Sequence, residues 1–327
     1  MKEISINEIG PIRIGQAENA EAGTGCTVFI YDEGMHAGLD VRGGGPASRE
    51  TPLLSPLTAA QRIHGIVLAG GSAYGLSAAS GVMQYLSEHD IGFDVGVTKV
   101  PLVVQSDLFD LTVGDPNVYP DEAMGYEATR RAFEEPNYKD GNYGAGCGAT
   151  VGKLCGMERC MKTGIGSYAV QIGDLKIGAV IALNALGDVF DWKNGKQIAG
   201  MLTEDGSAFA NSPEEMRKSL EDVTKRFVEN TTLGVIITNA RFHKSSLCKI
   251  AGLGHDGYAR SIRPVHTSLD GDSIYAVSVG DVIADREVVG LMAAEVISEA
   301  IIRAVDRAES AYGFPSAKEL KNVTREA

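Results

Sequence analysis

The chain has 327 residues, of which 43 are Asp or Glu and 30 are Lys or Arg, so its formal net charge is −13. Nucleic acids and anionic membranes select for clustered positive charge, and this composition argues against either as the main partner. The N-terminus lacks the apolar core of a signal peptide, and no apolar stretch reaches the roughly 18 residues of a membrane helix. From these features we expect a soluble protein of the cytoplasm.

The cysteines fit the same compartment. There are five of them, Cys26, Cys147, Cys155, Cys160 and Cys248. An odd and low number of cysteines in a chain of this length is typical of free thiols in a reducing environment. Cys155 and Cys160 do not have the spacing of a zinc site, and we expect neither a metal nor a cofactor.

The first half of the chain predicts strands separated by glycine-rich loops and helices. Gly23–Asp32 predicts a loop that enters a strand, and Ala37–Leu54 predicts a strand followed by a long Gly/Pro loop. Ile63–His89 predicts a buried strand, a Gly-Gly-Ser turn and a helix. A short extended run within Val97–Leu111 and a helix over Asp121–Glu135 follow.

The middle of the chain opens with a glycine-rich loop, Gly141–Lys153. Gly166–Asp191 then predicts a hairpin, with its turn at Gly173-Asp174. Residues 192–212 are polar and rich in turn formers, and we interpret them as an internal linker. A helix follows, with Ser212 as its N-cap and with its end at Asn230.

The C-terminal part predicts a buried strand over Leu233–Ile237, a helix over Lys244–Ile262, a strand over Ser273–Val279 and a long helix over Glu287–Tyr312. Strands and helices mix without strict alternation, and the hairpin favours antiparallel or mixed sheets that are covered by helices. We therefore expect one α/β domain over residues 1–327.

Asn230 and Thr231 stand where the predicted helix ends and the buried strand begins. A threonine hydroxyl is a weak nucleophile unless a base takes its proton, and one solution is an N-terminal Thr whose own α-amine is that base. An attack of Thr231 on the carbonyl of Asn230 would cut the chain and expose such an amine. Taken alone, the segment favours the ordinary interpretation, in which Asn caps a helix and Thr starts a strand.

Asp270 and Asp272 flank a glycine just before a predicted strand. In an extended chain, residues two apart project to the same side, so the two carboxylates would face one point and orient a hydroxyl and a cation. The alternative is a solvated Asp-Gly turn, which this short pattern favours when it is considered alone.

Lys153 and Asn184 are candidates of a second kind. Lys153 closes the glycine-rich loop, and in a dry site its pKa would fall, so that it could act as a base or as a charge partner of the aspartates. Asn184 ends an apolar strand, where its amide could donate to an oxyanion. A surface lysine and a turn asparagine are the ordinary alternatives.

Other residues carry weaker signals. Ser72 lies at a predicted strand-to-helix turn, but its surroundings do not match the G-x-S-x-G nucleophile elbow. Cys147 lies among glycines without an identifiable histidine partner. We interpret His266, close to Asp270 in the sequence, as a residue that orders its loop.

Together, these segments resemble the self-cleaving aminopeptidase/amidase family. The family includes L-aminopeptidase/D-esterases, β-peptidyl aminopeptidases and 6-aminohexanoate-oligomer endohydrolases. The likeness runs almost from end to end and is carried by segments such as "IHGIVLAGGSAYGLSAASGVMQYL", "GAGCGATVGK", "NTTLGVIITNARFHKSS" and "GHDGYARSIRPVHTSLDGDSIYAV".

The resemblance implies a nucleophile and a cut site. Thr231 matches the nucleophile, which would be freed by autocleavage after Asn230 to give subunits of residues 1–230 and 231–327. Asn-Thr at this point is similar to the nylon-oligomer (6-aminohexanoate) branch, whereas the aminopeptidase branch tends to have Gly-Ser.

The resemblance also implies the partners of the nucleophile. Asp270, Asp272, Lys153 and Asn184 match the site of the nylon-oligomer branch, and a serine and a glutamate replace the two aspartates in the aminopeptidase branch. The sequence is therefore closest in these motifs to the nylon-oligomer branch. Phe109 stands where we would look for the tyrosine of that site.

The fold that the resemblance implies is a four-layer α-β-β-α sandwich with mixed sheets, similar to N-terminal-nucleophile hydrolases and shared with ornithine acetyltransferases. The implied protein is a homotetramer or larger that hydrolyses a small amide or peptide. Two alternatives stay open: an acyltransferase of the ornithine acetyltransferase type, and a non-catalytic binding protein that keeps the fold.

Overall fold

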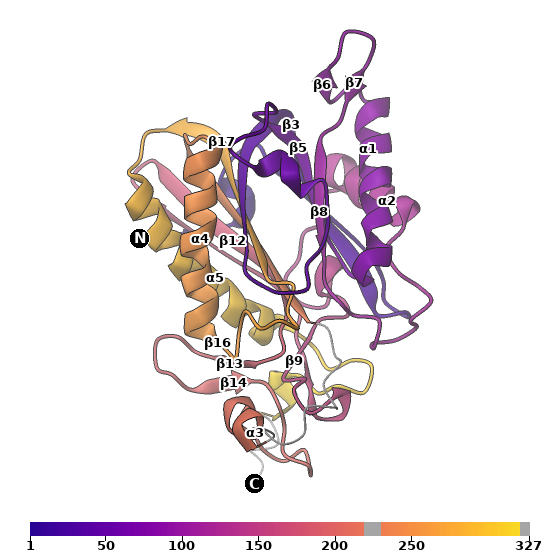
Figure 1. Ribbon diagram of the computed structural model, residues 1–327, viewed down its shortest axis with the longest axis vertical. Helices are drawn as coiled ribbons and strands as arrows, with labels where there is room; N and C mark the ends of the chain where they lie inside the picture. The colour runs from indigo at the N-terminus through magenta and orange to yellow at the C-terminus, as the bar shows by residue number, and fades with distance from the viewer. Residues whose placement is uncertain (219–229, 321–327) are drawn as a thin grey trace.

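The secondary-structure elements stack in four layers, with a pair of helices on either side of two sheets (Figure 1). The computed structural model describes residues 1–218 and 230–320. The predicted α-β-β-α sandwich with mixed sheets is confirmed. None of the helices in these two ranges combines the length and the apolar character that a membrane crossing requires.

The first sheet holds the strands that carry the candidate site. Its neighbouring strands are antiparallel, except that β15 and β17 run parallel. The predicted hairpin is confirmed as β11 and β12, and Gly173 turns it with a φ of 56°. The strand order is β1 (Lys2–Ile4), β11 (Ile165–Ile172), β12 (Leu175–Asn184), β15 (Thr231–Ala240), β17 (Ser273–Val282) and the C-terminal part of β3 (Thr24–Val41).

The second sheet consists of β2 (Arg13–Asn19), the N-terminal part of β3, β5 (Ile63–Ala69), β8 (Val103–Asp107) and β4 (Ala47–Arg49). Its pairs are antiparallel except β5 with β8.

Strand β3 belongs to both sheets. The sequence predicts two separate strands here, but the structure has one strand of 18 residues. Residues 24–30 pair in the second sheet and residues 36–41 pair in the first. A register shift between Ile30 and Met35, with Gly34 at a φ of 76°, marks the bend between the two parts. The chain thus bends at this point and continues as one strand.

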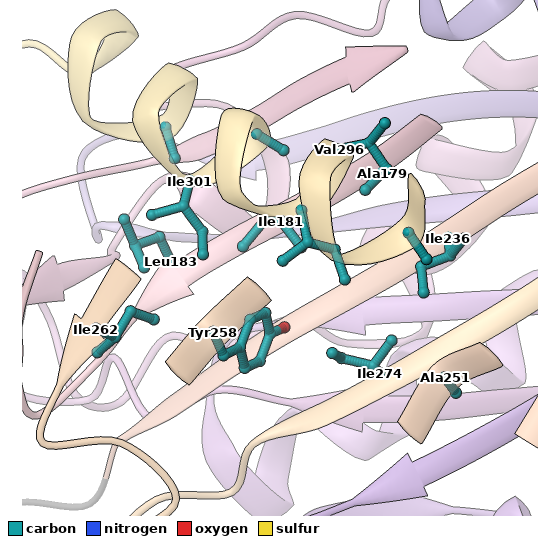
Figure 2. Close-up of a cluster of buried hydrophobic side chains, with 14 of the residues drawn as sticks. Ala179, Ile181, Leu183, Ile236, Ala251, Tyr258, Ile262, Ile274, Val296 and Ile301 are labelled. Carbon is teal, nitrogen blue, oxygen red and sulfur yellow. The ribbon is translucent and has the colours of Figure 1, made fainter. Parts of the chain in front are cut away.

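The helices cover the outer faces of the sheets. α1 (Ala78–Glu88) and α2 (Glu122–Glu134) pack on the second sheet, and α4 (Lys244–Ser261) and α5 (Arg286–Arg307) pack on the first. Separate clusters of buried apolar side chains fill the three spaces between the layers. Figure 2 shows the cluster under α4 and α5, where Ile181 and Ile236 of the sheet face Tyr258 and Ile301 of the helices.

Short strands complete the described chain. The interpretation of residues 192–212 as a linker was wrong, because this stretch contributes β14 to a small sheet and buries Met201. The short strands form three small sheets: β6 (Phe93–Asp94) with β7 (Lys99–Val100), β9 (Thr150–Val151) with β10 (Met161–Lys162), and β13 (Asp188–Phe190) with β14 (Gln197–Ala199) and β16 (Ile262–Arg263).

Helix α3 (Ser212–Lys218) begins differently from the prediction. The side chain of Asn211 accepts the N–H of Glu214 at 3.0 Å, whereas Ser212 is buried and its hydroxyl donates to Asp188 at 2.7 Å. The prediction of Ser212 as N-cap was therefore wrong. The rest of that predicted helix, residues 219–229, lies outside the described ranges, and Asn230 forms a parallel bridge with Asp270.

Candidate active site

Three neighbouring strands of the first sheet bring the candidate residues to one edge. The parallel strands β15 and β17 both begin at this edge, and the antiparallel strand β12 ends there. Asn184, the last residue of β12, pairs directly with Thr231, the first residue of β15. Asp272 immediately precedes β17, and Asp270 bridges to Asn230. The topology thus gathers residues from three distant segments of the chain.

Thr231 is buried, with 3% of its surface exposed. Its hydroxyl Oγ1 donates to the carbonyl oxygen of Asn230 at 2.5 Å. That carbonyl also accepts the N–H of Gly271 at 2.7 Å, and the N–H of Asn230 donates to the carbonyl of Leu269 at 3.0 Å. The peptide group before Thr231 is therefore held in place beside the hydroxyl.

The two aspartates are buried on either side of Gly271. Asp270 Oδ2 accepts the N–H and the hydroxyl of Thr267, at 2.9 and 2.6 Å. Asp272 Oδ1 accepts the N–H of Thr232 at 2.9 Å. Burial, and then the charge of Asp272, raise the pKa of Asp270 from 3.8 to about 6. The pair is thus buried beside Thr231, and its two members hold different hydrogen-bond partners.

Lys153 and Asn184 contact each other directly. The Nζ of Lys153 donates to Oδ1 of Asn184 at 2.7 Å, and both side chains are buried. Burial lowers the pKa of Lys153 from 10.5 to about 8. The amide nitrogen of Asn184 donates to the carbonyl of Phe109 at 2.9 Å, which occupies one of its two hydrogens. Asn184, the partner of Thr231 on the neighbouring strand, therefore has an oriented amide that contacts a lysine of lowered pKa.

The weaker candidates lie in other settings. Ser72 has a φ of 52° at the turn after β5, and its N–H donates to the carbonyl of Leu108. Cys147 is buried with its sulfur 3.4 Å from the hydroxyl of Tyr312, and burial raises the pKa of its thiol. A raised pKa keeps the thiol protonated and a poor nucleophile.

Two residues of the site region were missed or placed differently by the sequence. His266, which the sequence analysis interpreted as a residue that orders its loop, contacts Asp272 through Nδ1 at 2.8 Å. Lys162 is fully buried, and its Nζ donates to the carbonyls of Gly146, Ala149 and Thr163. Burial lowers the pKa of Lys162 from 10.5 to about 7. The residues next to Lys162 in the sequence gave no indication that it would be buried.

The fold matches solved structures along nearly the whole chain. The L-aminopeptidase D-Ala-esterase/amidase from Ochrobactrum anthropi, described as a variant of the Ntn hydrolase fold, matches with a TM-score of 0.69 and 17% identity, over 98% of this chain and 93% of that chain. The chain therefore has an α/β fold with mixed sheets that resembles the Ntn hydrolase fold. Within this class, the chain belongs to peptidase family S58, whose sequence model matches residues 5–318.

Relatives of known sequence support the same membership. An uncharacterised aminopeptidase of Mycobacterium leprae is 34% identical, over 95% of this chain and 92% of the relative. The 6-aminohexanoate-oligomer endohydrolase of Kocuria sp. strain KY2 is 30% identical, over 90% of this chain and 83% of the relative. The predicted family and its hydrolase class are confirmed. Identity along the whole chain is slightly higher with the aminopeptidase, so it does not favour the nylon-oligomer branch.

Proposed function

We propose that this chain is an amide hydrolase that cuts itself between Asn230 and Thr231 and then uses Thr231 as its N-terminal nucleophile. The observation that carries the proposal is the 2.5 Å contact between the Thr231 hydroxyl and the carbonyl oxygen of Asn230. Membership of family S58 supports the hydrolase class. The products of the cut are subunits of residues 1–230 and 231–327.

In the proposed self-cleavage, Thr231 Oγ1 attacks the carbonyl carbon of Asn230. The C–N bond to Thr231 breaks, and the hydroxyl proton ends on the freed amine. Water then hydrolyses the ester, which releases the Asn230 carboxyl and restores the Thr231 hydroxyl. The N–H of Gly271, 2.7 Å from the carbonyl oxygen, is placed to stabilise the negative charge that this oxygen gains during the attack.

In the proposed turnover, Thr231 Oγ1 attacks the carbonyl carbon of the substrate, and the leaving amine departs with a proton. The α-amine of Thr231 or Lys153 takes the hydroxyl proton, since burial lowers the pKa of Lys153 to about 8. Asn184 donates to the oxyanion, and Asp270 and Asp272 orient the cationic groups. Water then releases the acyl group from Thr231.

For the substrate, we propose a small amide or peptide. The names of the relatives point to aminopeptidase substrates and to 6-aminohexanoate oligomers. The pair of aspartates beside Thr231 supports the oligomer branch, because a serine and a glutamate match these positions in the aminopeptidase branch. Rates on 6-aminohexanoate oligomers and on amino-acid p-nitroanilides decide between the two. We also propose a cytoplasmic homo-oligomer, a tetramer or larger, which native mass measurement tests.

The experiment that tests the hydrolase proposal is intact mass on the purified chain after incubation. We expect fragments of residues 1–230 and 231–327, a Thr231→Ala variant that stays uncut and inactive, and a Thr231→Ser variant that still cleaves. An uncut chain that hydrolyses amides, or a fully active Thr231→Ala variant, would refute the proposal.

A further inference from the structure

His266 belongs to the site through Asp272, although it does not contact Thr231. Asp272 is almost fully buried, at 1% exposure, and its Oδ2 accepts both the backbone N–H and Nδ1 of His266, at 3.1 and 2.8 Å. The other oxygen, Oδ1, accepts the N–H of Thr232 at 2.9 Å. One carboxylate therefore ties the residue after the nucleophile to His266.

The backbone of His266 is shaped for this contact. Its φ is 57°, in the left-handed region that few residues other than glycine adopt. This conformation accompanies a loop in which the N–H and the ring of one residue reach the same carboxylate oxygen. A strained backbone at such a point persists only where the surrounding structure fixes it.

Apart from the bond to Asp272, few polar contacts account for an imidazole at position 266. Within residues 1–218 and 230–320, its Nε2 is buried and has no hydrogen-bond partner. Its ring packs edge-on against the ring of His255, with centroids 4.7 Å apart. A buried polar atom without a partner is unfavourable. The hydrogen bond to Asp272 is therefore the contact that accounts for a histidine, rather than an apolar residue, at this position.

The hydrogen bonds of Asp272 and its neighbours fix the position of Thr231. Asn230 is held by Leu269 and Gly271 on one side of Thr231, and Thr232 is held by Asp272 on the other side. If Asp272 loses its side-chain donor, the carboxylate can turn about its own torsions and the grip on Thr232 loosens. We propose that His266 is a positioning residue, which fixes Asp272 and thereby aligns Thr231 for attack.

This inference rests on the proposed role of Thr231, and its test uses three variants of the full chain. His266→Ala removes the side-chain donor. His266→Asn restores one, because the amide nitrogen of Asn lies near the place of Nδ1 and Asn tolerates a positive φ. His36→Ala is the control, since His36 lies away from the site along β3, where its Nδ1 contacts the carbonyl of Gln61 and its ring packs edge-on against His243.

We expect His266→Ala to slow self-cleavage by about 10- to 100-fold, the cost of a misplacement of up to ~1 Å. In the processed enzyme kcat should fall by more than KM changes. His266→Asn should cleave within about threefold of wild type, and His36→Ala at the wild-type rate. Melting temperature, recorded for each, separates positioning from loss of fold.

Equal cleavage rates of His266→Ala and wild type would overturn the inference, as would a His266→Asn variant that is as slow as His266→Ala at the same melting temperature. If His266→Ala fails to fold, His266→Gln takes its place, because the amide of Gln lies one methylene further from the backbone than that of Asn. The His266→Gln chain should then cleave itself at least tenfold more slowly than the His266→Asn chain. A wild-type chain that never cleaves would instead refute the proposed function.

Discussion

Gly271 packs directly against the hydroxyl of Thr231, and Gly271→Ala therefore gives the sharpest test of the proposed cut. A Cβ at this position would lie 2.5 Å from Thr231 Oγ1 and 2.9 Å from the carbonyl oxygen of Gly45. Ordinary contacts begin at 3.4 Å, so Thr231 Oγ1 has to move by about 0.9 Å. Gly271 does not have a positive φ, so alanine can adopt this backbone conformation. Only the steric contacts of the added Cβ oppose the substitution.

A shift of ~1 Å in a reacting group costs about 100-fold in rate. We therefore expect Gly271→Ala to slow self-cleavage by about 100-fold, which corresponds to about 2.7 kcal/mol in the activation barrier. The added methyl group should also lower the free energy of unfolding by about 1–3 kcal/mol through overpacking. The two effects are separable, because the first is measured as a rate and the second as an equilibrium.

The assay is a time course of intact mass after pulse synthesis in vitro, with the free energy of unfolding measured by urea titration. Gly45→Ala is the matched control, because it lies in the facing loop and the nearest atoms to its Cβ are 3.9 Å away. It should cleave within about twofold of wild type, since nothing there needs to move. Cleavage of Gly271→Ala at the wild-type rate would refute the reasoning that Thr231 Oγ1, in its observed position, is the attacking atom.

Three further predictions concern pH and packing. Because burial and the charge of Asp272 raise the pKa of Asp270 to about 6, its carboxylate is neutralised below that pH. Amide hydrolysis by the processed enzyme should therefore slow as pH falls through about 6, and Asp270→Asn should be slow with no such limb between pH ~5 and ~7. A Cβ at Gly81 of α1 would lie 1.8 Å from a backbone carbonyl of α2, so Gly81→Ala should cost about 3 kcal/mol or more in urea unfolding, whereas Gly252→Ala in α4, with 3.4 Å of room, should be neutral or stabilising by up to ~1 kcal/mol. The hydroxyls of Ser106 and Tyr275 are buried 2.6 Å apart, so Tyr275→Phe should cost about 1–2 kcal/mol, and a double-mutant cycle with Ser106→Ala should show coupling above ~0.5 kcal/mol.

Local pattern was enough to predict the elements that are built from local contacts. The hairpin, helix α4 and helix α5 were predicted within a few residues, because a turn at Gly173 and runs of apolar residues at helical spacing are properties of short segments. The bend of β3 was not predicted, because a glycine among polar residues, as at Gly34, is compatible both with a turn between two strands and with a bulge within one strand. Only the pairing of both halves with distant strands distinguishes the two.

Burial of charged residues was the harder problem for the same reason. Lys153 and Lys162 are both fully buried. Lys153 donates to an oxygen of Asn184 on β12, and Lys162 donates to the carbonyl of Ala149 in the glycine-rich loop. Nothing in the residues beside a lysine states how dry its surroundings are, because the shell is supplied by the tertiary structure. A catalytic Lys153 was therefore only one of two interpretations at the end of the glycine-rich loop, with a surface lysine as the alternative, until the resemblance supported it, and Lys162 was missed.

The position of Thr231 beside the loop of the two aspartates follows from topology more than from the motif. β15, α4 and β17 form one strand–helix–strand unit with parallel strands, so both strands begin at the same edge of the sheet. Any residue that opens β15 must then lie beside the loop that leads into β17, and Thr231 lies beside Gly271 for this reason. The antiparallel partner β12 has to end where β15 begins, which delivers Asn184 to the same edge. Strand order thus explains why residues 184, 231 and 272 meet, while the chemistry depends on which side chains occupy those three ends.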